Sequence, residues 1–271
     1  MPELPEVETT RLGIEPLVQH QTISSVVVRQ ARLRQTVPVS LQTELPGQSI
    51  ISTTRRGKYL LLNVDSGCII IHLGMSGSLR YLPSEVPPAK HDHVDIVFTT
   101  GCCIRFNDPR RFGLILWTQD QPLSHPLLRS LGPEPLLDDF NADYLYGQAR
   151  GRKVAVKTFL MNSRIVVGVG NIYANEALFM AGIRPTIAAG RISKPRYALL
   201  VATVKQVLSA AIKVGGTTLR DFTASDGQPG YFAQQLKVYG KKKGLCPRCG
   251  HTIRLVILGQ RATYYCAKCQ H

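Results

Sequence analysis

The sequence predicts an α+β protein, in which an antiparallel β-sandwich with a packed helix is followed by a helical region and a small metal-binding module. Three observations predict this architecture. Apolar residues alternate with a period of two through much of the first half. Helical spacing dominates the second half, and two Cys-x-x-Cys pairs close the chain. At 271 residues the chain is long enough for two domains.

The charge is strongly positive, with 33 Lys and Arg against 18 Asp and Glu and a net charge of +15. Such an excess favours a polyanionic partner, nucleic acid first, over a solvated basic surface without a partner. No apolar run approaches the roughly 20 residues of a membrane span, and no secretory signal is visible. We therefore expect a soluble, cytoplasmic protein that does not bind membranes.

Residues 5–19 are expected to form the first helix. Pro5 suits its first turn, and Val7, Ile14 and Val18 would share one face. Glu8 would sit favourably near the helix start. Helix chemistry does not by itself require the Pro2-Glu3 pair that precedes it.

Four β-rich runs follow the first helix and should form the sandwich. They read SVVVRQARLR, SIISTTRRGKYLLLNV, CIIIHLGMSGSLRYL and HVDIVFTTGCCIRFNDPRRFGLILW. The DSG at 65–67 and the TTG at 99–101 interrupt these runs as hairpin turns do. Within them, Cys68, Cys102 and Cys103 are expected to be buried small hydrophobic residues.

The alternating pattern ends at LGPEPLLDDF, residues 131–140, whose Pro and Gly residues are typical of an interdomain connection. VAVKTFLMN, NIYANEALFMAG and KPRYALLVATVKQVLSAAIKVGG then have helical spacing, and the glycines at 215–216 should end the longest helix.

The C-terminal cysteines predict one structural Zn²⁺ ion. Cys246 and Cys249 form one pair, and after sixteen intervening residues Cys266 and Cys269 form the other. Four thiolates close a tetrahedral shell, which leaves no open position for catalysis. Redox-active or unpaired thiols are the alternative. Because the module is short, metal binding and folding should be coupled.

Two turns could bind phosphate. A hairpin between the cysteine pairs would present Gln260 and Arg261, whose guanidinium suits a bidentate phosphate contact. The turn Gly168-Val169-Gly170 precedes a helix, and Asn171 would sit at its cap and add a side-chain donor. A solvated turn and a plain interhelical connection are the alternatives.

Two further loops combine apolar and cationic side chains. Met75 lies between small residues in HLGMSGSLR, and Arg110 and Phe112 lie beside a proline in NDPRRFG. Exposed apolar wedges next to arginine are typical of proteins that kink DNA, although a core Met and a solvated Arg pair are the more common roles. Lys58 lies at a strand entry and is otherwise an ordinary exposed base.

These segments together resemble the bacterial formamidopyrimidine-DNA glycosylases, which excise 8-oxoguanine and ring-opened purines and also cleave abasic (AP) sites. The resemblance covers essentially the whole chain. It rests on PELPEVE, HLGMSG, KHDHVD, NDPRRFG, LGPEPL, GVGNIYANEALF, DGQPGYF and QRATYYC in this order. It implies a catalytic β-sandwich domain at 1–134, a linker at 135–151, a helix–two-turn–helix domain at 152–243 and a zinc finger at 244–271.

The resemblance also implies roles for individual residues. Pro2, after loss of Met1, is the nucleophile and Glu3 the carboxylate that moves protons. The phosphate binders near the lesion are Lys58, Asn171 and Arg261, with Lys58 and Arg261 also counted as catalytic. Further residues are implied at the DNA or at the site: His91, His93, Arg110, Lys157 and Glu6. Met75, Arg110 and Phe112 fill the gap left by the extruded base, and residues 218–226 form a loop over that base.

A terminal proline suits this chemistry. An α-amino group has an unperturbed pKa of about 7.7–8.0 against about 10.4 for lysine, so more of it is neutral near pH 7. As a secondary amine, Pro2 can form only a charged iminium, which promotes β- and then δ-elimination. Damaged duplex DNA is the implied partner, and nothing signals an obligate oligomer, so a monomer is expected.

Two positions depart from the family pattern: Asn162 stands where Asp is common, and Arg220 where close relatives carry Lys. Arg220 would change contacts of the loop over the base, so this position bears on base preference. The alternatives are an endonuclease VIII-like glycosylase for oxidised pyrimidines and a non-catalytic zinc-finger DNA-binding protein. The latter leaves Pro2 and Glu3 without a role.

Overall fold

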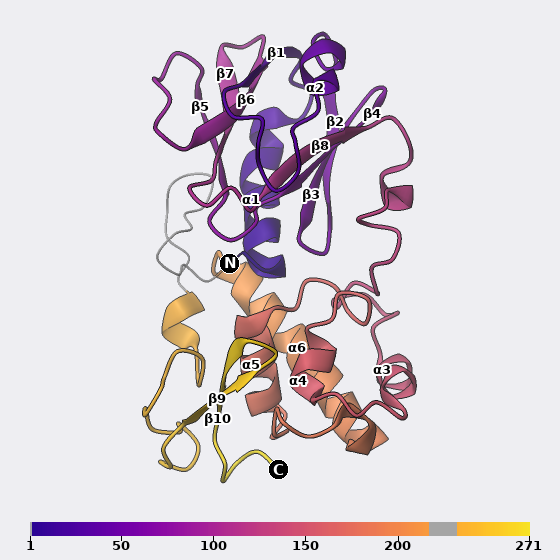
Figure 1. Ribbon diagram of the computed structural model, residues 1–271, viewed down its shortest axis with the longest axis vertical. Helices are drawn as coiled ribbons and strands as arrows, with labels where there is room; N and C mark the ends of the chain where they lie inside the picture. The colour runs from indigo at the N-terminus through magenta and orange to yellow at the C-terminus, as the bar shows by residue number, and fades with distance from the viewer. Residues whose placement is uncertain (1, 217–231) are drawn as a thin grey trace. The chain divides into compact units, whose positions relative to one another are not determined.

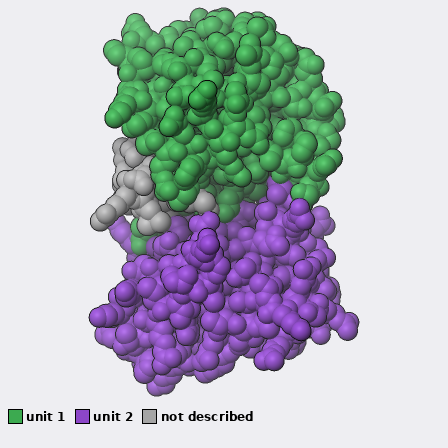
Figure 2. Space-filling model, viewed as in Figure 1, with its two compact units in different colours: residues 1–130, 214–233 green, residues 131–213, 234–271 purple. Residues whose placement is uncertain are grey.

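The computed structural model describes residues 2–216 and 232–271 (Figure 1). The chain forms two compact units (Figure 2). Unit 1 comprises residues 1–130 and 214–233, and unit 2 comprises residues 131–213 and 234–271. In the described part of the chain, no helix has the length and apolar character needed to cross a membrane.

Unit 1 is built on two four-stranded antiparallel sheets. The first has the order β1-β6-β7-β5 and contains β1 (Ile23–Val28), β6 (Asp92–Phe98), β7 (Cys102–Asn107) and β5 (Ser78–Pro83). The second has the order β2-β3-β4-β8 and contains β2 (Ile50–Arg56), β3 (Tyr59–Val64), β4 (Gly67–His72) and β8 (Leu114–Thr118). One core joins apolar residues of both sheets with those of the first helix, so the predicted sandwich is confirmed.

The expected hairpin turns are present. Val64 pairs with Gly67 across the first, and Gly101 takes a φ of 81° in the second. Cys68 and Cys103 are buried as expected, whereas Cys102 is only half-buried. Two short helical elements complete the unit, α2 (Ser40–Glu44) and η1 (Pro122–Ser124).

The first helix, α1, spans Leu4–Val18 and contacts β2, β3 and β5, so it packs against strands of both sheets. Val7, Ile14 and Val18 are buried as their spacing predicts. The prediction that the helix does not need Glu3 is wrong. Glu3 is its N-cap and forms a capping box with Glu6, because a helix start leaves backbone N–H groups that need acceptors.

Glu8 also does more than favour the helix dipole. Its carboxylate lies 2.8 Å from the guanidinium of Arg11 and 2.8 Å from that of Arg55 on β2. Partial burial opposes ionisation, but the hydrogen bonds from both arginines outweigh it and lower the pKa of Glu8. The pair with Arg55 therefore connects α1 to the second sheet.

Unit 2 is mainly helical. Its helices are α3 (Ala142–Ala149), α4 (Val156–Leu160), α5 (Asn171–Met180) and α6 (Lys194–Lys213), with the 3₁₀ turn η2 (Ala189–Arg191) before α6. A further 3₁₀ turn, η3 (Phe232–Gln235), spans the second boundary between the units. The longest helix, α6, ends just before Gly215 and Gly216, which have φ of 78° and 77°. A two-stranded sheet of β9 (Arg254–Leu258) and β10 (Arg261–Tyr265) forms the C-terminal module.

Candidate functional site

The N-terminal segment of unit 1 is buried and tightly held. Pro2 is buried, and Glu3 is only 1 % exposed. The backbone N–H of Glu3 donates to the carboxylate of Glu6 at 2.7 Å, and the Glu3 side chain accepts from the Glu6 backbone in return. The capping box thus fixes the backbone immediately after Pro2, and so limits where the proline ring can lie.

Glu6 also lies next to Gly216, which belongs to the second sequence segment of unit 1. A Cβ on Gly216 would lie 3.1 Å from a Glu6 carboxylate oxygen, so only glycine fits there without displacing Glu6. Gly216 also accepts a hydrogen bond from the backbone N–H of Phe232 at 3.0 Å. That bond joins the residues on either side of 217–231, a segment that lies outside the described part of the chain. Arg220 and the loop expected at 218–226 belong to this segment.

Two loops of unit 1 carry the expected gap-filling residues. Residues 73–77 join β4 to β5, and residues 108–113 join β7 to β8. In the antiparallel registers Tyr59 pairs with His72 and His72 with Leu114 in one sheet, and Ser78 and Asp92 both pair with Asn107 in the other. Each loop therefore crosses from one sheet to the other at a strand end.

Asp108 ties the two loops together. Its side chain is 0 % exposed and accepts from the Ser76 hydroxyl at 2.7 Å and from the Gly113 backbone N–H at 2.7 Å. The backbone N–H of Arg110 adds a contact of 3.3 Å. A buried carboxylate with these donors is a strong constraint, because losing one leaves a desolvated charge underbonded.

Two glycines allow the loops to touch. A Cβ on Gly74 would lie 2.4 Å from the backbone N of Gly113 and 2.4 Å from the carbonyl carbon of Phe112. A Cβ on Gly113 would lie 2.6 Å from the Phe106 ring. Any larger residue would separate the loops, so the glycines in HLGMSG and RRFG are required by close backbone approach.

The expected gap-filling side chains lie on these loops. Met75 is half-buried in its turn, and Arg110 is exposed. Phe112 is 46 % exposed, and the Arg110 guanidinium carbon lies 4.9 Å from the centre of its ring. An exposed aromatic ring next to a cation can enter a base stack while the cation meets a phosphate. The structure thus brings Arg110 and Phe112 together and places the Met75 loop against theirs.

Lys58 lies in the two-residue turn between β2 and β3, next to His72. The Tyr59 and His72 ring centres are 4.9 Å apart across β3 and β4. Burial, helped by the charges of Lys58 and Arg34, lowers the pKa of His72 to about 4. His72 is therefore neutral near pH 7, and its Nδ1 accepts a hydrogen bond from the Gly74 backbone at 2.9 Å. This bond steadies the loop that carries Met75.

The KHDHVD segment is mostly structural. His93 is buried and its Nε2 donates to the Asp108 carbonyl oxygen at 2.8 Å. His91 is half-buried, and its ring lies edge-on to the His93 ring with 6.3 Å between the ring centres. Asp95 of the same strand accepts two hydrogen bonds of 2.9 Å from the buried Arg105. His93 thus supports the 108–113 loop from behind, and His91 is the more accessible histidine.

In unit 2, Lys157 is a buried hub. Its side chain is only 1 % exposed, and Nζ donates to Oδ1 of Asn171 at 2.5 Å and to Thr263 Oγ1 at 2.7 Å. A third bond of 3.0 Å reaches the Ala262 carbonyl. Lys157 therefore connects α4 to the start of α5 and to β10. The sequence alone indicated a cationic residue on a helix, not this burial.

Asn171 is the first residue of α5, and Gly170 is the N-cap, so the expectation that Asn171 itself caps the helix is wrong. Gly170 has the extended backbone of an N-cap, with φ −118° and ψ −157°, and the Asn171 side-chain oxygen accepts from Lys157 instead. Since an ammonium can only donate, this contact turns the Asn171 Nδ2 donor away from Lys157. Asn162, where the family commonly has Asp, accepts from the Arg164 backbone at 3.0 Å, a role that an amide fills as well as a carboxylate.

Two buried side chains of α5 fasten the C-terminal module, and neither was predicted from the sequence. The Glu176 carboxylate accepts three backbone N–H groups, from Lys237 at 2.8 Å, Val238 at 2.9 Å and Tyr239 at 2.8 Å. Asn175 accepts from the Tyr264 backbone at 2.7 Å. The motif NIYANEALF contains both residues, but only the fold shows what they hold.

The four C-terminal cysteines converge as their spacing predicts. All four Sγ atoms lie within 4.8 Å of one another. Cys246 and Cys269 are 3.8 Å apart, and Cys249 and Cys266 are 3.5 Å apart. Zn–S bonds of about 2.3 Å in a tetrahedron place sulfurs about 3.8 Å apart, so the set fits one Zn²⁺ ion. Four protein ligands make the site structural.

The hairpin of the module ends in a tight turn, Gly259 and Gln260, with φ of 52° and 60°. Arg261 follows as the exposed first residue of β10. It lines a pocket of about 360 Å³ together with Lys157, Asn162 and Arg152. Arg152, Lys157 and Arg261 thus line one pocket beside this turn, and a phosphate contact of Arg261 stays a prediction.

These features define a class: a protein with a four-cysteine site for one Zn²⁺ ion, a buried N-terminal segment and exposed cationic loops. Three family models match the chain. They are the formamidopyrimidine-DNA glycosylase N-terminal domain over residues 1–115, the formamidopyrimidine-DNA glycosylase H2TH domain over 131–223, and the zinc finger found in FPG and IleRS over 245–271. The zinc finger prediction is confirmed.

The chain belongs to the formamidopyrimidine-DNA glycosylase family. It is 59 % identical over 271 residues to the formamidopyrimidine-DNA glycosylase of Nitrosococcus oceani, covering 100 % of both chains. It is 57 % identical over 270 residues to that of Syntrophotalea carbinolica, again with 100 % of both covered. The resemblance predicted from the sequence is therefore confirmed.

Solved structures agree. The MutM (Fpg) protein of Thermus thermophilus aligns with a TM-score of 0.89 and 35 % identity, covering 99 % of this chain and 98 % of that one. A Lactococcus lactis Fpg complex with abasic-site DNA aligns with a TM-score of 0.92 and 34 % identity, covering 99 % of each chain. A complex of a mutant of that protein with Fapy-dG DNA has a TM-score of 0.93 and 34 % identity, with 100 % of each covered. The α+β class with a helix–two-turn–helix domain is confirmed.

Proposed function

We propose that the protein is a bifunctional DNA glycosylase and AP lyase of base excision repair that excises oxidised purines from duplex DNA. The observation that carries the proposal is the buried Pro2-Glu3 pair, held by the Glu6 capping box, in a chain that belongs to this family over its full length. Action on the chromosome places it in the bacterial cytoplasm, at the nucleoid, and it works as a monomer.

Pro2 is the proposed nucleophile. With Met1 removed, its secondary amine attacks C1′ of the lesion nucleotide, the bond from C1′ to the base breaks, and the base leaves with a proton. The C1′–O4′ bond of this adduct then breaks and O4′ takes a proton, so the sugar ring opens and leaves an iminium between Pro2 and C1′. Its positive charge acidifies the C2′ protons; loss of one expels the 3′ phosphate, and a second elimination expels the 5′ phosphate. Hydrolysis of the imine then restores Pro2.

Glu3 is the proposed proton carrier. It adjoins the nucleophile in sequence, and the capping box with Glu6 restrains its carboxyl group. A carboxylate there can pass protons between the amine, the sugar oxygen and the eliminating carbon. The capping role and the catalytic role are compatible, because a carboxylate has two oxygens with about four lone-pair sites.

The remaining residues serve DNA binding in this proposal. Arg110, Phe112 and Met75 fill the gap left by the extruded base, which offsets the few kcal/mol of unstacking. Lys58, His91, Asn171 and Arg261 contact phosphates, and Lys157 aims Asn171 while His93 supports the Arg110 loop. The zinc ion, when bound, holds the finger that carries Arg261 and takes no part in the chemistry.

A lesion panel tests the function. Duplexes with 8-oxoguanine, a formamidopyrimidine or an oxidised pyrimidine are incubated with the protein, and the strand ends are identified by gel and mass. The proposal expects base release and phosphate at both ends of the gap for the purine lesions. One Lactococcus lactis Fpg complex contains oxidised-pyrimidine DNA, so preference is read from relative rates. Faster excision of the pyrimidine would favour the endonuclease VIII-like alternative, and binding without release the non-catalytic one.

A further inference from the structure

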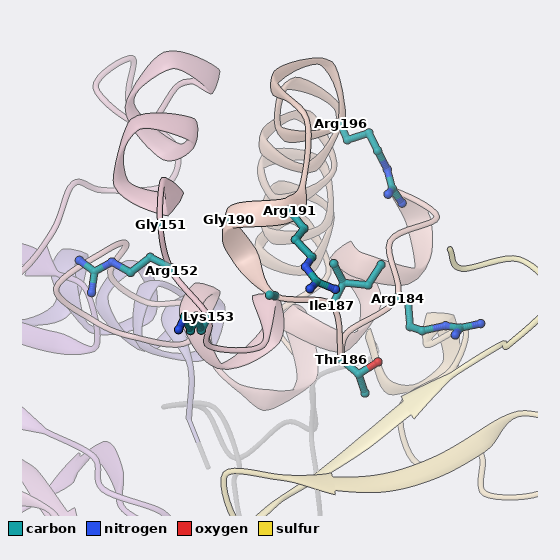
Figure 3. Close-up of a pocket in the computed structure, with 10 residues that line it drawn as sticks. Gly151, Arg152, Lys153, Arg184, Thr186, Ile187, Gly190, Arg191 and Arg196 are labelled. Carbon is teal, nitrogen blue, oxygen red and sulfur yellow. The ribbon is translucent and has the colours of Figure 1, made fainter.

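A hollow of about 880 Å³ in unit 2 is lined by five cationic side chains and by no acidic one (Figure 3). Arg152 and Lys153 lie before α4, Arg184 follows α5, and Arg191 and Arg196 flank the start of α6. In the view of Figure 3, Arg191 lies between the Arg152–Lys153 side and the Arg184–Arg196 side. The five cationic residues come from three separate segments of the chain, so the fold brings their charges together.

The walls of the hollow are held by backbone hydrogen bonds. Residues 152–156 and 187–190 are joined as an irregular antiparallel pair by three bonds: Val156 N to Ile187 O at 2.7 Å, Ala189 N to Val154 O at 2.9 Å, and Gly190 N to Arg152 O at 2.9 Å. The buried Tyr197 hydroxyl donates to the Ala189 carbonyl at 2.9 Å. A Cβ on Gly190 would lie 3.0 Å from the Arg152 oxygen, so the segments are in close contact.

Most of the charge in the hollow is not neutralised within the described part of the chain. Among the described residues, no acidic side chain forms an ion pair with any of the five cations. Arg152 and Arg184 donate to backbone carbonyls, which position a guanidinium without cancelling its charge. Arg196 donates to the Gly182 carbonyl and to an oxygen of His271, the last residue, whose carboxylate offsets part of the charge of Arg196. Lys153 and Arg191 are exposed and have no side-chain hydrogen bond to described residues. Like charges at such proximity repel, so an anion is the complementary occupant.

The lining indicates which kind of anion. Guanidinium forks match phosphate geometry, and a hydroxyl from Thr186 adds a donor. No aromatic side chain lines the hollow, so there is no surface for stacking a base. The site is therefore suited to a phosphate group and not to a nucleobase or another planar ring.

We propose that this hollow is a second phosphate-binding site, distinct from the one formed by Asn171 and Arg261, and that it takes a backbone phosphate of duplex DNA outside the lesion. Arg152 lines both this hollow and the smaller pocket that contains Lys157 and Arg261. The cationic surface thus continues from the finger tip into the hollow. The DNA source rests on the proposed function, whereas the phosphate site does not.

The first experiment probes the site with inorganic phosphate. Amide resonances of ¹⁵N-labelled, zinc-loaded protein are followed during a phosphate titration. Shifts at Gly151, Thr186 and Gly190 are expected in the wild type and should be lost in Lys153→Ala/Arg191→Ala. They should persist in Lys242→Ala/Lys268→Ala, which removes the same charge from exposed positions outside both pockets. Absent shifts, or shifts that both variants keep, would overturn the site.

The second experiment identifies the source of the phosphate. Affinity for a long undamaged duplex is measured against salt for both variants. Loss of one phosphate contact should lower the slope of log K against log salt by about 0.9 in the pocket variant beyond any change in the control. Equal slopes would overturn the DNA occupant and assign the site to free phosphate. Failure of the proposed function would appear elsewhere, as wild-type protein that does not excise a lesion from a short duplex.

Discussion

The backbone N–H of Glu3 lies 2.7 Å from a carboxylate oxygen of Glu6, so the residue next to the proposed nucleophile is held by a helix cap. Glu6→Ala should therefore affect both stability and chemistry. Removing the acceptor leaves a buried N–H unpaired, which costs about 1–3 kcal/mol of unfolding free energy. The rate of strand cleavage at an abasic site should fall further than DNA affinity does.

Urea unfolding and single-turnover cleavage measure the two effects. Glu6→Gln is the matched control, since its amide oxygen can still accept from Glu3, and it should retain most of the stability. Equal cleavage rates for wild type and Glu6→Ala would contradict a positioning role for Glu6.

Asp108 should control the gap-filling loops. Asp108→Ala removes the acceptor shared by Ser76, Arg110 and Gly113. Each lost hydrogen bond to a buried charge is worth about 1.5–3 kcal/mol, so the loops should loosen. Base extrusion, followed with a fluorescent adenine analogue beside the lesion, should slow markedly.

Ser76→Ala removes one of the same bonds and should produce a smaller effect in the same direction. Unchanged extrusion in Asp108→Ala, in a protein shown to be folded by its melting curve, would separate the loops from the lesion step.

Arg261 and Lys157 should respond differently to substitution although both are cations near the finger. Arg261 is exposed, so Arg261→Ala should leave stability unchanged, weaken DNA binding and lower the salt slope by about 0.9. Lys157 is buried and donates to three partners. Lys157→Met should therefore lower the free energy of unfolding by at least about 1 kcal/mol. Thermal melting and salt titration of both variants would disprove this division if Arg261→Ala melted lower than Lys157→Met.

Protonation of His72 should weaken the fold in acid. Burial, with Lys58 and Arg34 nearby, lowers its pKa from 6.5 to about 4. Between those values the unfolded chain binds a proton that the folded chain does not, so stability falls as pH falls through that window. His72→Gln should remove on the order of 1–3 kcal/mol of this loss between pH 6.5 and 4. Parallel stability curves for the two proteins from pH 7 to 4 would rule out the contribution.

Sequence patterns identified much of this molecule. Val7, Ile14 and Val18 have the spacing of a buried face, and the cysteine pairs have that of a zinc site, because both depend on short-range periodicity. The alternating runs likewise predict the two sheets. Each of these features is local, so the chain shows it without knowledge of the fold.

The buried charges are different. Asp108 and Glu176 look like ordinary acidic residues in sequence, and their roles depend on backbone donors that the fold brings from residues 76 and 237–239. The resemblance implies that Lys157 lies at the site, but its hydrogen bonds to β10 depend on the fold. The sequence did contain one indication for Asp108. An Asp that precedes a proline in a turn favours hydrogen bonds from its side chain to nearby backbone N–H groups.

The central claim is that the Pro2 nitrogen forms the covalent bond to DNA. Intact mass first establishes that Met1 is absent. The protein is then incubated with 8-oxoguanine duplex and borohydride, and the adduct is digested and mapped by mass spectrometry. Reduction of the iminium should leave a stable cross-link at Pro2. A cross-link at a lysine, or no cross-link while the lesion strand is cleaved, would contradict the account.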